Sequence, residues 1–177
     1  MSFLQRIFGA ATRSDRSGET ETVRRIAARL ERLPQPRARH LAAFAYVLAR
    51  VANSDLRISE TETDAMLALV REHAGLSGEE AALAVEIAKS QTRLLGGTEN
   101  YVVTREFREI STREERMRLL HCLYAVAAAD GTIASAESAE IAKIAEELGF
   151  LREEALALRA PWRDKLSEFQ ALPKKSS

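Results

Sequence analysis

Apolar residues recur at spacings of three and four along most of this sequence, which is the pattern of one buried face of an α-helix. The stretch at 37–52 differs because it is apolar on most sides, for example at Leu41, Phe44 and Leu48. Such all-round apolarity indicates a buried central helix. Together with capping residues and with stops at Gly and Pro, the spacing predicts further helices at 19–33, 59–75, 77–96, 100–110, 111–129, 135–148 and 151–169, the last kinked at Pro161. We therefore expect an all-α fold, a compact bundle of seven to eight helices with 37–52 and 111–129 as a central antiparallel pair.

Three segments are predicted along the chain: an N-terminal amphipathic segment with a flexible linker at 1–18, a helical domain at 19–170 and a disordered tail at 171–177. In the first segment the apolar side chains share one helical face; they are Phe3, Leu4, Ile7 and Phe8. One interpretation is a frayed terminus or a helix docked on the core. The other is a weak interfacial anchor beside neighbouring arginines, which would contact a membrane or a partner.

A degenerate repeat runs through the helical domain at an offset of 75 residues. The second copy reads Asp130-Gly131-Thr132-Ile133 with Glu137 seven residues after the Asp, and the first reads Asp55-Leu56-Arg57-Ile58 with Glu62. Self-similarity of this kind is typical of one supersecondary unit used twice. The repeat predicts a pseudo-two-fold arrangement of two helix–acidic turn–helix units.

The paired carboxylates of each turn have two interpretations. In the structural one, Asp130 bonds its own turn and Glu137 caps the next helix, while Ser59 and Glu62 form a capping box at the first copy. In the other, Asp130, Glu137, Asp55 and Glu62 bind Ca²⁺ or Mg²⁺. Two carboxylates per turn are too few for such a cation, so carbonyls and water, or convergence of both turns on one ion, would be needed. Leu56 in place of the glycine indicates that the first site is the degenerate one.

Charge selects no partner overall, because 26 basic residues balance 26 acidic ones. The distribution is uneven: residues 1–50 contain ten arginines and four acidic residues, whereas residues 51–110 contain six basic and eleven acidic residues. Few aromatic residues accompany the arginines, so we expect a solvated helix face and no nucleic-acid partner.

The sequence contains no pattern typical of thiol chemistry, of a histidine metal site or of a catalytic nucleophile. The single cysteine, Cys122, lies in an apolar run and predicts a buried small side chain. His40, His73 and His121 have no metal-ligand spacing, and we find no nucleophile arrangement or phosphate-binding loop. The sequence contains no secretory signal and no long apolar run, so we expect a cytoplasmic protein that is not an enzyme.

The second repeat resembles the signature of the bacterial tellurite-resistance TerB-like domains. The resemblance covers roughly residues 38–165 and is carried by Ala127-Ala128-Ala129-Asp130-Gly131-Thr132-Ile133 with Glu137, by the upstream run from Tyr101 through Phe107 to Leu119-Leu120, and by Ile144-Ala145-Glu146-Glu147-Leu148-Gly149-Phe150. It implies an all-helical, pseudo-two-fold domain whose acidic residues are proposed to bind a divalent cation. It also implies a cytoplasmic protein of stress-response and membrane-associated systems, with no established enzymatic activity. A related domain begins certain membrane-anchored co-chaperones.

The resulting expectation is a non-enzymatic TerB-like binding module. It would bind a divalent cation through its acidic turns and contact an unknown protein partner, with the N-terminal segment reaching the inner membrane peripherally. The alternative is a protein–protein adaptor without any ligand, in which the turns are only structural.

Overall fold

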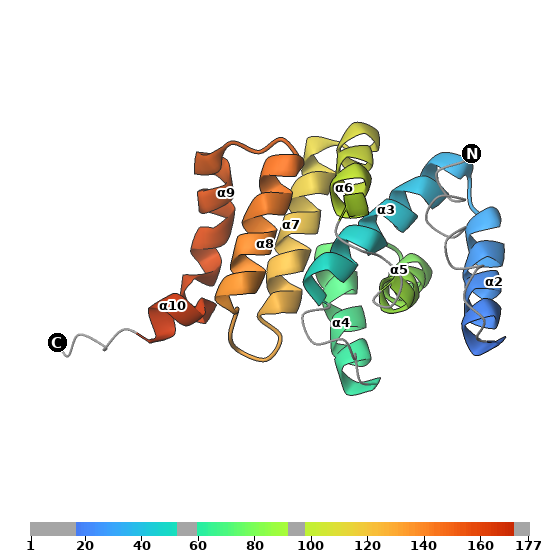
Figure 1. Cartoon of the computed structure of the whole chain (residues 1–177), viewed down its shortest axis with the longest axis horizontal. Coiled ribbons are helices and arrows are strands. Elements are labelled where there is room, and N and C mark those ends of the chain that lie inside the picture. The colour runs from blue at the N-terminus through green and yellow to red at the C-terminus, as the bar shows by residue number, and fades with distance from the viewer. Residues whose placement is uncertain (1–16, 53–59, 92–97, 172–177) are drawn as a thin grey trace.

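The computed structural model describes residues 17–52, 60–91 and 98–171 of the chain. Within these ranges the fold is all-helical, and the only pairing outside helices is an isolated parallel bridge between Ile133 and Leu166. The elements, shown in Figure 1, are α2 (Ser17–Glu31), α3 (Gln35–Ala52), α4 (Glu60–His73), α5 (Gly78–Gln91), α6 (Thr98–Ile110), α7 (Arg113–Ala127), α8 (Ser135–Glu147), α9 (Arg152–Arg159), the 3₁₀ helix η2 (Ala160–Lys165) and α10 (Ser167–Gln170). The expected all-α class is confirmed.

Helix ends follow the capping chemistry of the sequence. Thr112 accepts a hydrogen bond from the N–H of Glu115, whose side chain accepts one from the N–H of Thr112, so α7 begins with a complete capping box. At the end of α8, Gly149 has φ 86°, a left-handed conformation that glycine adopts without steric cost. The N–H of Gly149 bonds to the carbonyl of Glu146 and that of Phe150 to the carbonyl of Ala145, which is a Schellman motif.

One helix boundary was predicted incorrectly. Residues 151–169 do not form a single kinked helix, because α9 ends at Arg159 and the chain continues as η2 and then α10. Pro161 lies in the first turn of η2. Proline has no backbone N–H and clashes with the preceding helical turn, so the α-helix gives way to the tighter helix there. This break redirects the following residues toward the turn between α7 and α8.

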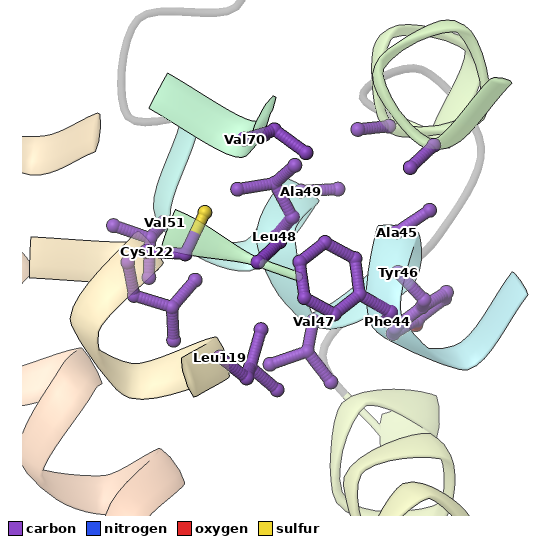
Figure 2. Close-up of a cluster of buried hydrophobic side chains, with 14 of the residues drawn as sticks. Phe44, Ala45, Tyr46, Val47, Leu48, Ala49, Val51, Val70, Leu119 and Cys122 are labelled. Atoms are coloured by element: carbon purple, nitrogen blue, oxygen red, sulfur yellow. The ribbon is translucent and has the colours of Figure 1, made fainter. Parts of the chain in front are cut away.

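Helix α3 is the centre of the domain, as its apolar composition predicts. Every residue from His40 to Ala49 is buried, and the helix packs against α2, α5, α6, α7 and α8. Figure 2 shows the resulting cluster, in which side chains of α3 such as Phe44 and Leu48 gather with Val70 of α4 and Leu119 of α7. The apolar side chains predicted on most sides of this helix are therefore covered by neighbouring helices.

The predicted antiparallel arrangement of α3 and α7 is wrong. Both helices run from the upper to the lower part of the view in Figure 1. In agreement, the carboxylate of Glu115 at the start of α7 acts electrostatically on Arg37 and His40 near the start of α3. Sequence periodicity identifies the two buried faces but carries no information on the relative direction of the helices. Because the two helices run the same way, both end on the same side of the domain.

The repeat is visible in the helix boundaries. Helix α3 ends at Ala52 and α7 at Ala127, while α4 begins at Glu60 and α8 at Ser135, so both pairs of ends differ by the predicted offset of 75 residues. Helix α4 packs on α7, and α8 packs on α3 as well as on α7. The pseudo-two-fold relation between the two units stays a prediction.

Cys122 lies completely buried on α7, and burial raises the pKa of its thiol to about 12. Since the thiolate is the reactive form, we expect Cys122 to resist Ellman's reagent in the folded protein and to react fully in denaturant. Reaction at native conditions with the rate of a free cysteine would contradict this placement.

No helix within the described ranges is both long and apolar enough to cross a membrane. The N-terminal residues Phe3, Leu4, Ile7 and Phe8, and the tail from residue 172 onward, lie outside the described residues.

Candidate functional site

The second acidic turn joins α7 to α8 and is held by its own side chains. After the C-cap residue Ala128, the N–H of Gly131 bonds to the carbonyl of Ala128 at 2.9 Å, and Gly131 has φ 95°. The Asp130 carboxylate oxygen Oδ1 accepts a hydrogen bond from the N–H of Thr132 at 3.0 Å. This bond, accepted by an Asp side chain from the backbone N–H two residues later, forms an Asx-turn.

Glu137 is also committed to the backbone. It is the third residue of α8, and its Oε2 accepts a hydrogen bond from the N–H of Ala134 at 2.8 Å. The positive end of the helix dipole favours a carboxylate at this position. Both carboxylates of the second copy therefore perform the structural roles that the sequence allows.

Residues 160–170 form a strap that covers this turn, a contact that the sequence pattern does not predict. The N–H of Ile133 bonds to the carbonyl of Lys165 at 2.7 Å, and the N–H of Ser167 bonds to the carbonyl of Ile133 at 3.0 Å. Gln170 adds two contacts, because its amide donates to the carbonyl of Gly131 at 3.0 Å and accepts from the Thr132 hydroxyl at 2.9 Å. The strap thus bonds two carbonyl oxygens of the turn, those of Gly131 and Ile133, and holds the turn against residues 165–170.

The two copies of the repeat do not form a metal centre within the described residues. Asp55 lies outside those residues, and Glu62 lies exposed in the first turn of α4. In the described ranges, no group of three or more His, Cys, Asp or Glu side chains is arranged to hold a metal ion. The structure thus places Asp130 and Glu137 on one turn and leaves their relation to Asp55 undescribed.

A buried ionic cluster around Arg50 was not predicted. The Arg50 side chain, 2% exposed, donates to Glu140 at 2.5 Å and to Glu147 at 2.6 Å, both on α8. It also donates to the hydroxyl of Thr104 on α6 at 2.6 Å. The cluster links the end of α3 to α6 and α8. A single Arg ending an apolar run reads as a surface residue, so only the spacing of Glu140 and Glu147 on one face of a helix hinted at such a partner.

Four arginines of α2 and α3 pair with acidic residues of neighbouring helices. Arg25 and Arg29 of α2 both pair with Glu86 of α5. Arg37 pairs with Glu80 through two hydrogen bonds, which lower the pKa of the Glu80 carboxyl to about 2. Arg39 pairs with Glu106 of α6. The uneven charge distribution of the sequence is therefore used in part for packing between helices.

The histidines are half-buried or buried parts of the helical core. His40 contacts the ring of Phe107, with centroids 5.1 Å apart, and burial lowers the pKa of its imidazole. Burial also lowers the pKa of His121 on α7, with a smaller effect from His73 on α4.

Residues of the strap itself line one depression, an open hollow of about 460 Å³ formed by Ala160, Pro161, Arg163, Asp164 and Phe169. Arg163 lies over the ring of Phe169, 4.6 Å from its centroid. A hollow this open differs from the concave, largely enclosed pockets that bind small molecules.

These features define an all-helical domain with a capped acidic turn and, among the described residues, no group of three or more His, Cys, Asp or Glu side chains that could hold a metal ion. Comparison with known protein families identifies the domain: residues 38–160 match the family described as tellurite resistance protein TerB. The chain belongs to the TerB family, which is generally non-enzymatic. No curated protein and no solved structure matches the chain. Helix α2 and most of the strap lie outside the matched residues.

Proposed function

We propose that this chain is a non-enzymatic binding module that acts on a protein partner, and that its second acidic turn serves the fold. The observation that carries the proposal is the use of both carboxylates: Asp130 bonds the N–H of Thr132 and Glu137 bonds the N–H of Ala134. Membership in a generally non-enzymatic family supports the same conclusion.

A divalent cation is the second candidate ligand. The observation in its favour is that α3 and α7 run in the same direction. Both helices therefore end on one side of the domain, where the chain continues into the segments containing Asp55 and Asp130. Convergence of both segments on one Ca²⁺ or Mg²⁺ would supply more oxygen ligands than either turn alone.

Substitutions of Asp130 separate these two functions. Asp130→Asn keeps an oxygen that can accept the bond from Thr132 but removes the charge, whereas Asp130→Ala removes both. If the turn is structural, we expect Asp130→Ala to lower the free energy of unfolding by about 1 kcal/mol and Asp130→Asn to leave it nearly unchanged. Urea denaturation measures both values.

Added cation then completes the test. Under the proposal, millimolar CaCl₂ or MgCl₂ leaves the melting temperature of the wild type unchanged. A cation bound only by the native state would raise the melting temperature of the wild type and raise that of Asp130→Asn less. That pattern, accompanied by saturable heat in calorimetry, would replace the ligand-free proposal by the cation-binding one.

A further inference from the structure

Three arginines gather at the end of the domain opposite the acidic turn. Helix α6 ends there, α7 begins there, and the chain turns there from α8 into α9, at the top of Figure 1. We call the surface formed by Arg108, Arg113, Arg116 and Leu151 the arginine corner.

Backbone contacts hold two of these arginines in place. The Nη1 of Arg116 donates to the carbonyl of Leu148 at 2.9 Å. The guanidinium of Arg108 lies against Gly149 so closely that a Cβ at that position would be 2.9 Å from its Cζ. Arg113 lies over the ring of Phe150, 4.7 Å from its centroid, and pairs with Glu154. The guanidinium groups are therefore positioned by the turn that follows α8.

The positive charge of the corner is only partly neutralised. In the part of the chain that the structure describes, Glu154 pairs with Arg113, whereas neither Arg108 nor Arg116 has a carboxylate partner. The charges of Arg108 and Arg113, after the larger effect of burial, lower the pKa of Arg116. Four arginines of α2 and α3 differ in this respect, since Arg25, Arg29, Arg37 and Arg39 are each paired with a glutamate.

An apolar side chain adjoins this charge. Leu151, at the turn into α9, has 69% of its surface exposed although its neighbour Phe150 is buried. Guanidinium groups bind carboxylates through parallel hydrogen bonds, and an apolar contact beside them adds affinity and orientation. Surfaces that bind anionic lipid usually need four to eight clustered basic residues. The corner as defined has three. The neighbouring ring of Phe150 is buried and covered by Arg113, so it is not free to stack on a base.

We propose that the arginine corner binds an acidic segment of a protein partner, with a carboxylate at Arg108 and an apolar side chain of the segment against Leu151. This rests on the proposed function in one respect, namely that the partner is a protein.

The test uses the full chain and a fluorescein-labelled peptide of Glu and Ser residues around one Leu, with binding followed by fluorescence anisotropy. We expect Arg108→Glu to weaken peptide binding roughly tenfold or more, because it replaces an attractive charge by a repulsive one. The matched control is Arg24→Glu, an equal charge change at an exposed position of α2; it should alter binding less than twofold. Leu151→Ser should weaken binding severalfold, and a peptide with Lys in place of Glu should not bind.

Several outcomes would overturn the inference. These are no saturable binding of the acidic peptide, equal weakening by Arg108→Glu and Arg24→Glu, or preferential binding of phosphatidylglycerol vesicles or inorganic phosphate. Thermal melting of every variant verifies folding. If Arg108→Glu does not fold, Arg108→Gln, which keeps a long polar side chain over Gly149, takes its place with an expected loss of a few fold.

The failure of this site is distinguishable from failure of the proposed function. If a native partner co-purifies equally with wild type and Arg108→Glu, the module binds proteins through another surface and the corner is excluded. If the acidic peptide binds the corner but cation titration shows a Ca²⁺-dependent rise in stability, the corner stands and the ligand-free proposal falls.

Discussion

Replacing Arg50 by alanine is expected to destabilise the domain by about 3–5 kcal/mol. The reason is the environment of its partners: Arg50 is 2% exposed and Glu147 only 7% exposed, so the substitution leaves a carboxylate buried without a counter-charge. Thr104, fully buried on α6, loses a donor in the same step. An unpaired buried charge costs far more than the loss of an exposed ion pair.

Urea denaturation with tryptophan fluorescence measures this loss, because Trp162 is the only tryptophan of the sequence. The control is Arg25→Ala, which removes an ion pair whose arginine is 59% exposed; it should cost less than about 1 kcal/mol. A second variant, Arg50→Met combined with Glu147→Leu, removes the buried charges and should recover part of the loss. Equal effects of Arg50→Ala and Arg25→Ala would show that the cluster is not buried as described.

Phe107→Ala is also expected to have a large effect, lowering the free energy of unfolding by about 3–5 kcal/mol. Phe107 is completely buried on α6, and its ring contacts His40 at 5.1 Å and Phe44 at 6.3 Å between centroids. Both contacts are with α3, so the cavity opens where α6 meets the central helix. The surrounding side chains come from helices held on several sides, and they can collapse into the space only partly.

The matched control lies on the same helix. Tyr101 is 53% exposed, and Tyr101→Ala should change the free energy of unfolding by no more than about 0.5 kcal/mol. Equilibrium unfolding of both variants gives the comparison. A loss below about 1 kcal/mol for Phe107→Ala would contradict its position in the core.

Local features of the sequence predicted local structure well. The apolar residues around 37–52 predict a central helix, and α3 is buried along most of its length. Gly149 predicts the end of α8 because a left-handed residue is needed there, and the Schellman motif follows. Asp130 likewise makes a bond within its turn, and Glu137 bonds the backbone N–H of the N-cap residue of α8, as the sequence allows. In each case the interacting atoms lie within a few residues of one another.

Features that depend on distant residues were not predictable in the same way. The strap meets Ile133 from more than thirty residues away, and nothing in the pattern of residues 160–170 names that partner. The cluster of Arg50 requires α3, α6 and α8 to meet, and the direction of α3 relative to α7 depends on the same packing. Periodicity specifies which face of a helix is buried, but not which helix covers it.

Because the single cysteine, Cys122, is buried, no thiol is exposed on the folded protein for reagents to modify. Any single cysteine added on the surface would then be the sole site of labelling, without removal of the native one. A fluorophore attached at an exposed position of α9, such as Leu156, would report contacts near the arginine corner as changes in its emission. The same label at Thr132 would report displacement of the strap, so one unaltered core residue makes both ends of the domain separately observable.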